Sequence, residues 1–99
     1  MMNYSIYQVN RENSKSILFE SLRILNKMGI APTREKYNKV YAGETEDGDT
    51  HTILERIFRK FNIGRPSDFR GHSLSVSDVV ELDGVFYYCD SFCFKSINF

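Results

Sequence analysis

The sequence has few cysteines and no long apolar run. Its 99 residues include only two cysteines, Cys89 and Cys93, and no stretch approaches the roughly 20 apolar residues that a membrane-spanning helix needs. The first residues do not combine a basic segment with a following apolar run, as a secretory signal peptide would. We therefore expect a cytoplasmic protein with reduced thiols and no membrane contact.

The chain also has no net charge, because 13 Lys and Arg balance 13 Asp and Glu. It therefore lacks the basic excess of a general nucleic-acid-binding protein. The charges are nonetheless segregated: an acidic segment is followed by a basic one. The segments contain Glu44, Glu46, Asp47 and Asp49, then Arg56, Arg59, Lys60, Arg65 and Arg70. Such segregation suits docking to a charged partner, although an ordinary solvated surface is the simpler interpretation.

Motifs for phosphate binding and hydrolysis are absent. The chain has neither a P-loop nor G-x-G-x-x-G, and no G-x-S-x-G segment frames a serine. His72 and Asp78 flank three serines, but strand neighbours such as His72 and Ser73 point to opposite faces of a sheet. We therefore expect a protein that is not an enzyme.

Two cysteines and two histidines are potential metal ligands. The C-x-x-x-C spacing of Cys89 and Cys93 is acceptable for zinc. His51 and His72, however, are separated by a predicted helix and a loop, without the local pairing found in zinc fingers. We expect neither a metal nor a cofactor, and two half-buried thiols at the end of a strand.

Apolar periodicity predicts an α+β fold in a single domain over residues 1–99. We expect a small mixed or antiparallel sheet in the order β-α-β-α-β-β, with a possible final strand and two helices packed on one face. The predicted strands cover residues 4–9, 37–41 (ended by Gly43), 74–82, 85–89 and 92–97. The predicted helices cover residues 14–28, ended by Gly29, and 52–63, begun by a Thr52–Glu55 capping box and ended by Gly64.

Two glycines and one buried acid have expected structural roles. Asp83–Gly84 predicts a type I′ hairpin turn, because both residues tolerate positive φ, and a turn also explains Gly71. Asp78 interrupts the apolar side of a strand, where an unpaired carboxylate is costly. We expect Asp78 to accept hydrogen bonds from the N–H groups of residues 70–72 and to pair with Arg65 or Arg70, which would fix this loop.

Segments along nearly the whole chain resemble the YodL-like family of small bacterial proteins and domains. They are YSIYQV, FESLRILNKMGI, YNKVYAGE, ILERIFRKFNIGRPSDFRGHSLSVSDVVEL and YYCDSFCF. The last two are the most specific. Cys93 stands where the family pattern usually has glycine, in the DSFGF position.

The resemblance implies a mobile-element setting rather than a reaction. YodL-like domains occur alone and within multidomain proteins of plasmids, conjugative elements and phages in Gram-positive bacteria. The family offers no established catalytic residues to carry over. The genetic elements that carry the family imply roles in transfer, host takeover or resistance to host defence. This link is an association rather than a mechanism.

We therefore expect a non-enzymatic protein-binding module that inhibits or redirects a host or defence protein, for example a nucleoprotein nuclease such as a CRISPR effector. It is expected to be a monomer or a homodimer. The expected partner contacts are Arg65, Asp68, Arg70, His72, Glu44, Glu46, Asp47, Asp49, Phe92 and Phe94. The alternative is a small nucleic-acid-binding regulator that uses the basic helix end and the RPSDFRGH loop.

Overall fold

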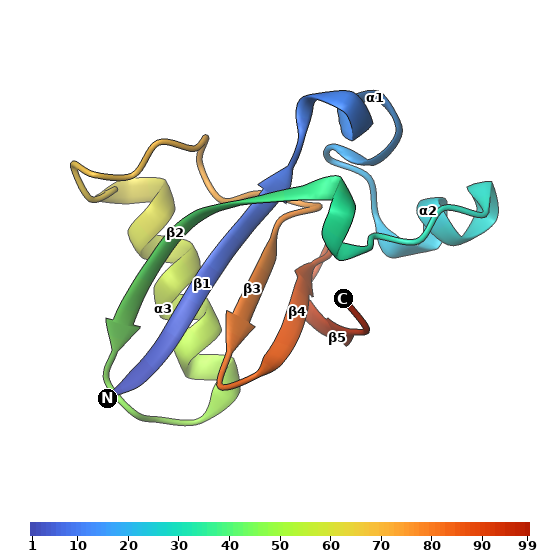
Figure 1. Ribbon diagram of the computed structural model, residues 1–99. Coiled ribbons are helices and arrows are strands. Elements are labelled where there is room, and N and C mark those ends of the chain that lie inside the picture. The colour runs from blue at the N-terminus through green and yellow to red at the C-terminus, as the bar shows by residue number, and fades with distance from the viewer.

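The computed structural model describes residues 1–99. Five strands form one antiparallel sheet in the order β2-β1-β3-β4-β5 (Figure 1). The strands are β1 (Met2–Val9), β2 (Tyr37–Thr45), β3 (Val79–Leu82), β4 (Val85–Cys89) and β5 (Phe94–Ile97); the α-helices are α1 (Ser14–Ile17), α2 (Leu22–Met28) and α3 (Thr50–Ile63). The predicted α+β class is confirmed. No helix has both the length and the apolar character needed to cross a membrane.

The helices cover opposite faces of the sheet. The apolar stripe of α3 packs against Ile6 and Val80 in one buried cluster. Ile17 of α1 and Leu25 of α2 pack in a second cluster, which contains Val79. Since successive strand residues point to opposite faces, Val79 and Val80 belong to different clusters. The expectation that two helices share one face is therefore wrong, and α3 alone lies behind the sheet in Figure 1.

The predicted first helix is two helices separated by an irregular link. Within the link, Phe19 has a φ of 66°, which non-glycine residues rarely adopt. The Phe19 N–H donates to Ser77 Oγ at 3.1 Å, and Tyr88 Oη donates to the Glu20 carbonyl at 2.7 Å. These long-range bonds satisfy backbone groups that a continuous helix would have used. Pattern alone could not reveal them.

Strand β2 is longer than predicted. It runs through Gly43 to Thr45, because β1 pairs with it along its whole length, with Met2 opposite Thr45. A backbone that gains ladder hydrogen bonds from a neighbouring strand continues as a strand despite a glycine. Glu44 is therefore part of an edge strand and not of a loop.

Helix α3 begins at Thr50, two residues before the predicted start. Asp49 is its N-cap, with Oδ1 accepting a hydrogen bond from the Thr52 N–H at 3.0 Å. The predicted capping box of Thr52 and Glu55 is therefore wrong, since an aspartate three residues earlier supplies the acceptor. The predicted end at Gly64 is confirmed.

Only the second half of the predicted strand 74–82 forms β3. The first half turns: the Asp78 N–H donates to the Ser75 carbonyl at 3.1 Å, and Ser77 has a φ of 90°. The following hairpin is as predicted, with φ of 50° at Asp83 and 82° at Gly84. The turn before β3 brings Asp78 into the protein interior, where it meets the loop that follows α3.

Candidate functional site

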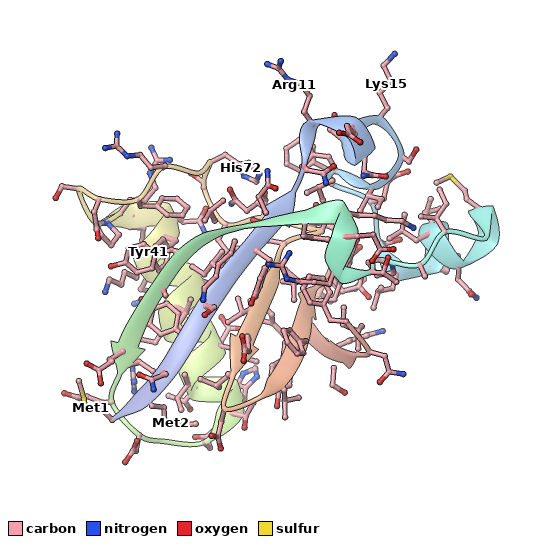
Figure 2. The ribbon with its side chains drawn as sticks, in the orientation of Figure 1. Met1, Met2, Arg11, Lys15, Tyr41 and His72 are labelled. Carbon is pink, nitrogen blue, oxygen red and sulfur yellow. The ribbon has the colours of Figure 1, made fainter.

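The loop of residues 64–73, between α3 and β3, is anchored in the core by an aromatic ring. Phe69 lies with its ring centroid 4.8 Å from that of Phe61 and 6.0 Å from that of Tyr41 (Figure 2 labels Tyr41). Both contacts are edge-to-face, the arrangement that aromatic pairs favour. The middle of the loop is therefore held on the α3 side of the sheet.

Gln8 of β1 holds the end of the same loop. Its Nε2 donates to the His72 carbonyl at 2.9 Å, and its Oε1 accepts from the His72 N–H at 3.2 Å. The amide thus satisfies both backbone groups of His72, as a neighbouring strand would. Gln8 is buried, and it was not among the expected site residues. Its one sequence signal is a long polar side chain within the apolar and aromatic segment YSIYQV.

Gly71 allows this close approach. A Cβ atom at position 71 would lie 2.1 Å from Gln8 Oε1 and 3.0 Å from a carbon of the Phe69 ring. A side chain would fit there only if the Gln8 amide moved away and lost its bonds to His72. Position 71 therefore needs glycine because of a neighbouring side chain, not because of the turn conformation that we expected.

Asp78 lies beneath the loop and is fully buried. Its Oδ2 accepts from the Ser75 N–H at 2.9 Å and from Gln8 Nε2 at 3.0 Å. The expected hydrogen bonds from residues 70–72 and the expected ion pair with Arg65 or Arg70 are wrong, because Gln8 stands between Asp78 and the loop backbone. Burial raises the pKa of Asp78 to about 8, and the hydrogen bonds from Ser75 and Gln8 oppose this rise.

Asp78 Oδ1 has no hydrogen-bond partner. His72 Nε2 lies 3.8 Å from this oxygen. His72 is labelled in Figure 2, where it extends from the loop near the end of β1. An oxygen buried without a partner is unusual in proteins and calls for an explanation.

The other partner contacts expected in the loop have no polar partner within the protein, apart from His72. Arg65, Asp68 and Arg70 are exposed, and none forms an ion pair or a side-chain hydrogen bond within the protein. His72 differs from them because its backbone and ring are both engaged. The loop therefore presents three unpaired charged side chains on a backbone that is tied to the core.

The expected acidic contacts lie at the other end of α3. Asp47 Oδ1 is 3.4 Å from the N-terminal ammonium of Met1, and Asp49 caps the helix. Glu44 and Glu46 are exposed on and just after β2. Because α3 has 14 residues, its length of about 21 Å separates these acids from the loop. The fold does not bring the two charged groups together.

Of the expected aromatic contacts, Phe92 lies in the turn between β4 and β5, and Phe94 is the first residue of β5. Phe94 packs on Phe58 of α3, with ring centroids 6.3 Å apart, whereas Phe92 is 99% exposed. Both line an open hollow of about 520 Å³ between α3 and the turn. The two cysteines line it as well, with Cys89 buried and Cys93 exposed.

The serines near His72 do not form a hydrolytic arrangement with it. The nearest partner of His72 Nδ1 is the Ser73 carbonyl, at 2.7 Å. Ser75 Oγ donates to the same carbonyl, and Ser77 Oγ accepts from a backbone N–H. No group of three or more His, Cys, Asp or Glu side chains is placed to hold a metal ion.

Comparison with known proteins identifies the family. The model of the YodL-like domain matches residues 3–99, which is nearly the whole chain. No curated protein and no solved structure matches the chain. The match covers the β1 strand, the loop and the β4–β5 turn, which are the parts that build the surface described above. The chain therefore belongs to the YodL-like domain family.

Proposed function

We propose that this protein is a non-enzymatic protein-binding module that recognises its partner through the loop of residues 64–73. The observation that supports this is the contrast between the loop's anchored backbone and its free charges on Arg65, Asp68 and Arg70. Binding residues are commonly found on loops that a rigid scaffold positions. Because Phe69 and Gln8 already hold the loop, less ordering entropy is lost on binding.

The loop's chemistry defines the partner surface. Arginine offers a planar fork of N–H donors that matches a carboxylate with two parallel hydrogen bonds. Two such arginines with one aspartate between them fit a mainly acidic surface that also carries a donor for Asp68. A partner that also touched the acids before α3 would have to span about 21 Å along that helix.

In biological terms, we propose that the partner is a host or defence protein, which the module inhibits or redirects on behalf of a mobile element. The support for this is the mobile-element setting that membership of the YodL-like family implies, which is an association. A nucleoprotein nuclease such as a CRISPR effector is the specific candidate. The contact residues are those of the loop, and the Phe92 turn is a second candidate surface.

The test is affinity capture from a host lysate, with and without nuclease treatment, followed by mass spectrometry. The decisive variant is Arg65→Glu/Arg70→Glu. Its control is Arg23→Glu/Lys27→Glu on α2, which makes the same change in net charge at two exposed positions. Figure 1 shows α2 on the opposite side of the molecule from the loop. We expect one nuclease-resistant partner that the control retains and the loop variant loses.

Retention of that partner by the loop variant would refute the proposal. Loss of all captured material on nuclease treatment would instead favour the nucleic-acid-binding alternative, which a steep salt dependence in a gel shift would support. Arg56, one of the basic residues counted for that alternative, donates to Thr45 Oγ1 and to the Glu46 carbonyl, each at 3.2 Å. That guanidinium is thus engaged within the protein, which favours the protein-binding function.

A further inference from the structure

Two hydrogen-bond acceptors face each other beneath the loop. His72 Nδ1 lies 2.7 Å from the Ser73 carbonyl oxygen. A carbonyl only accepts, so Nδ1 must carry the ring proton, and Nε2 of the neutral ring is then an acceptor. This Nε2 lies 3.8 Å from Asp78 Oδ1, which has no other partner. An ionised carboxylate would therefore direct a lone pair at another lone pair.

Gln8 cannot donate a hydrogen bond that would separate Asp78 Oδ1 from His72 Nε2. Its Nε2 lies 3.3 Å from the other ring nitrogen, His72 Nδ1. Its two N–H groups are used by the His72 carbonyl and by Asp78 Oδ2. Nor is a cation close by, because the only ion-pair contact of Asp78 is the one with His72. The other titratable groups that face Asp78 are Tyr37 of β2 and Tyr88 and Cys89 of β4. None of these brings a positive charge.

We propose that Asp78 and His72 hold one shared proton, and that this proton keeps the loop attached to the sheet. The proton resides either on Oδ1, which then donates to Nε2, or on Nε2, which then forms an imidazolium opposite a carboxylate. Both arrangements contain the same number of protons. Either one turns the contact between two acceptors into a hydrogen bond, for which the 3.8 Å separation of Nε2 and Oδ1 must shorten by about 1 Å.

Loss of the proton acts on the loop through Gln8. Asp78 Oδ2, Gln8 Nε2 and the His72 carbonyl form one continuous chain of hydrogen bonds. A deprotonated pair leaves a buried charge beside a lone pair, which is costly. The His72 side chain is 42% exposed, so its path to solvent is open. When His72 moves into solvent, the adjacent Gly71 loses its contact with Gln8, and this end of the loop detaches from the sheet.

The resulting device is pH-dependent: the loop is held at and below neutral pH and is released in mildly alkaline solution. Burial raises the pKa of Asp78 to about 8, which agrees with this direction. The consequence for partner recognition rests on the function proposed above. The proton itself does not, and the following tests use the free protein.

The first test follows the wild-type protein by NMR between about pH 6 and about pH 9. The ¹³C shift of the Asp78 carboxyl is expected to change above neutral pH, and the ¹⁵N shifts of the His72 ring show whether the shared proton is on Nε2. The amide signals of Gly71 and His72 are expected to move with the same midpoint. An ionised Asp78 beside a neutral His72 ring at the lowest pH would overturn the proposal, as would loop amides that do not respond.

The second test uses Asp78→Asn, whose NH₂ group replaces Oδ1 and donates to the neutral Nε2 without a proton that titrates. Its control is Asp68→Asn, which removes an exposed charge from the same loop. The readout is the rate of tryptic cleavage after Arg70. We expect the ratio of the wild-type rate to the Asp78→Asn rate to rise severalfold with pH, while Asp68→Asn follows the wild type.

An Asp78→Asn variant that follows the wild type would overturn the proposal. If that variant does not fold, the wild-type titration decides alone. If charge reversal at Arg65 and Arg70 leaves partner binding intact, the proposed function fails. These measurements on the free protein would still stand.

Discussion

Gln8 and Asp78 are 70 positions apart in sequence, yet Gln8 Nε2 donates to Asp78 Oδ2 at 3.0 Å. The same amide group holds both backbone groups of His72. One side chain of β1 therefore ties together the turn before β3 and the loop that follows α3.

Gln8→Ala is expected to destabilise the protein by about 2 kcal/mol, because it removes one of the two donors to the buried Asp78 Oδ2 and both partners of the His72 backbone. The measurement is urea unfolding at neutral pH. Asn38→Ala is the control, since Asn38 lies opposite Gln8 in the β1–β2 register and is exposed. Equal stability of the two variants would show that the Gln8 hydrogen bonds do not hold the structure.

Gly71→Ala is expected to lower the free energy of unfolding by about 1–3 kcal/mol, the cost typical of overpacking. The added methyl group would meet Gln8 Oε1 at 2.1 Å, and the Gln8 amide must move away to admit it. Gly64→Ala, at the start of the same loop, has nothing within 4 Å of its new Cβ. Thermal unfolding should show a clear loss for position 71 and little change for position 64.

The stability of the wild-type protein is expected to fall as pH rises from the ordinary carboxyl pKa of 3.8 toward about 8. In this window the unfolded state has lost the Asp78 proton while the folded state keeps it. The expected slope from this group is about −1.4 kcal/mol per pH unit. Below the window and above it, Asp78 contributes no slope.

Asp78→Asn isolates this contribution, since it removes the titrating group and retains a side chain of the same shape. Urea unfolding at several pH values should show a flatter stability profile for the variant than for the wild type. Parallel profiles would contradict a raised Asp78 pKa. The pKa values of Glu35 and Asp49 are lowered from 4.5 and 3.8. These groups therefore affect only the acidic end of the window, and measurements are best made above about pH 5.

The two thiols are expected to differ sharply in reactivity. Cys93 is exposed, whereas Cys89 is buried, and burial raises the pKa of the Cys89 thiol to about 12. The thiolate is the nucleophile, so Cys89 should be inert in the folded protein. Mass spectrometry after iodoacetamide treatment should find one modified cysteine under native conditions and two in denaturant. Native modification at Cys89 would show that the hollow opens.

Phe92 and Phe94 are expected to contribute very differently to stability. Phe92 is 99% exposed, so Phe92→Ser should change the free energy of unfolding by less than about 0.5 kcal/mol. Phe94 packs on Phe58, and Phe94→Ala should cost about 2 kcal/mol, below the value for a fully buried ring. Chemical denaturation of both variants measures the contrast. A large loss at Phe92 would mean that the turn packs more closely than the structure shows.

Local patterns in the sequence determine much of the fold. The spacing of Leu54, Ile57 and Phe61 produces the buried apolar stripe of α3. The apolar periodicity stops after Phe61, and the helix ends at Gly64. Asp83 and Gly84 specify the hairpin by their tolerance of positive φ. In each case the residues that decide the structure are neighbours along the chain. The α+β class and the antiparallel hairpin are therefore readable from the sequence.

Only the tertiary structure decides the break at Phe19, the opposite placement of the helices and the network beneath the loop. The helix breaks at Phe19 because Ser77, in the turn before β3, and Tyr88 of β4 offer hydrogen bonds to the backbone of Phe19 and Glu20. Asp78 Oδ2 accepts from Gln8 and Ser75 rather than from residues 70–72, because Gln8 of β1 stands between Asp78 and that part of the loop. Hydrogen bonds of buried polar groups depend on which groups meet in space, and no local spacing records that.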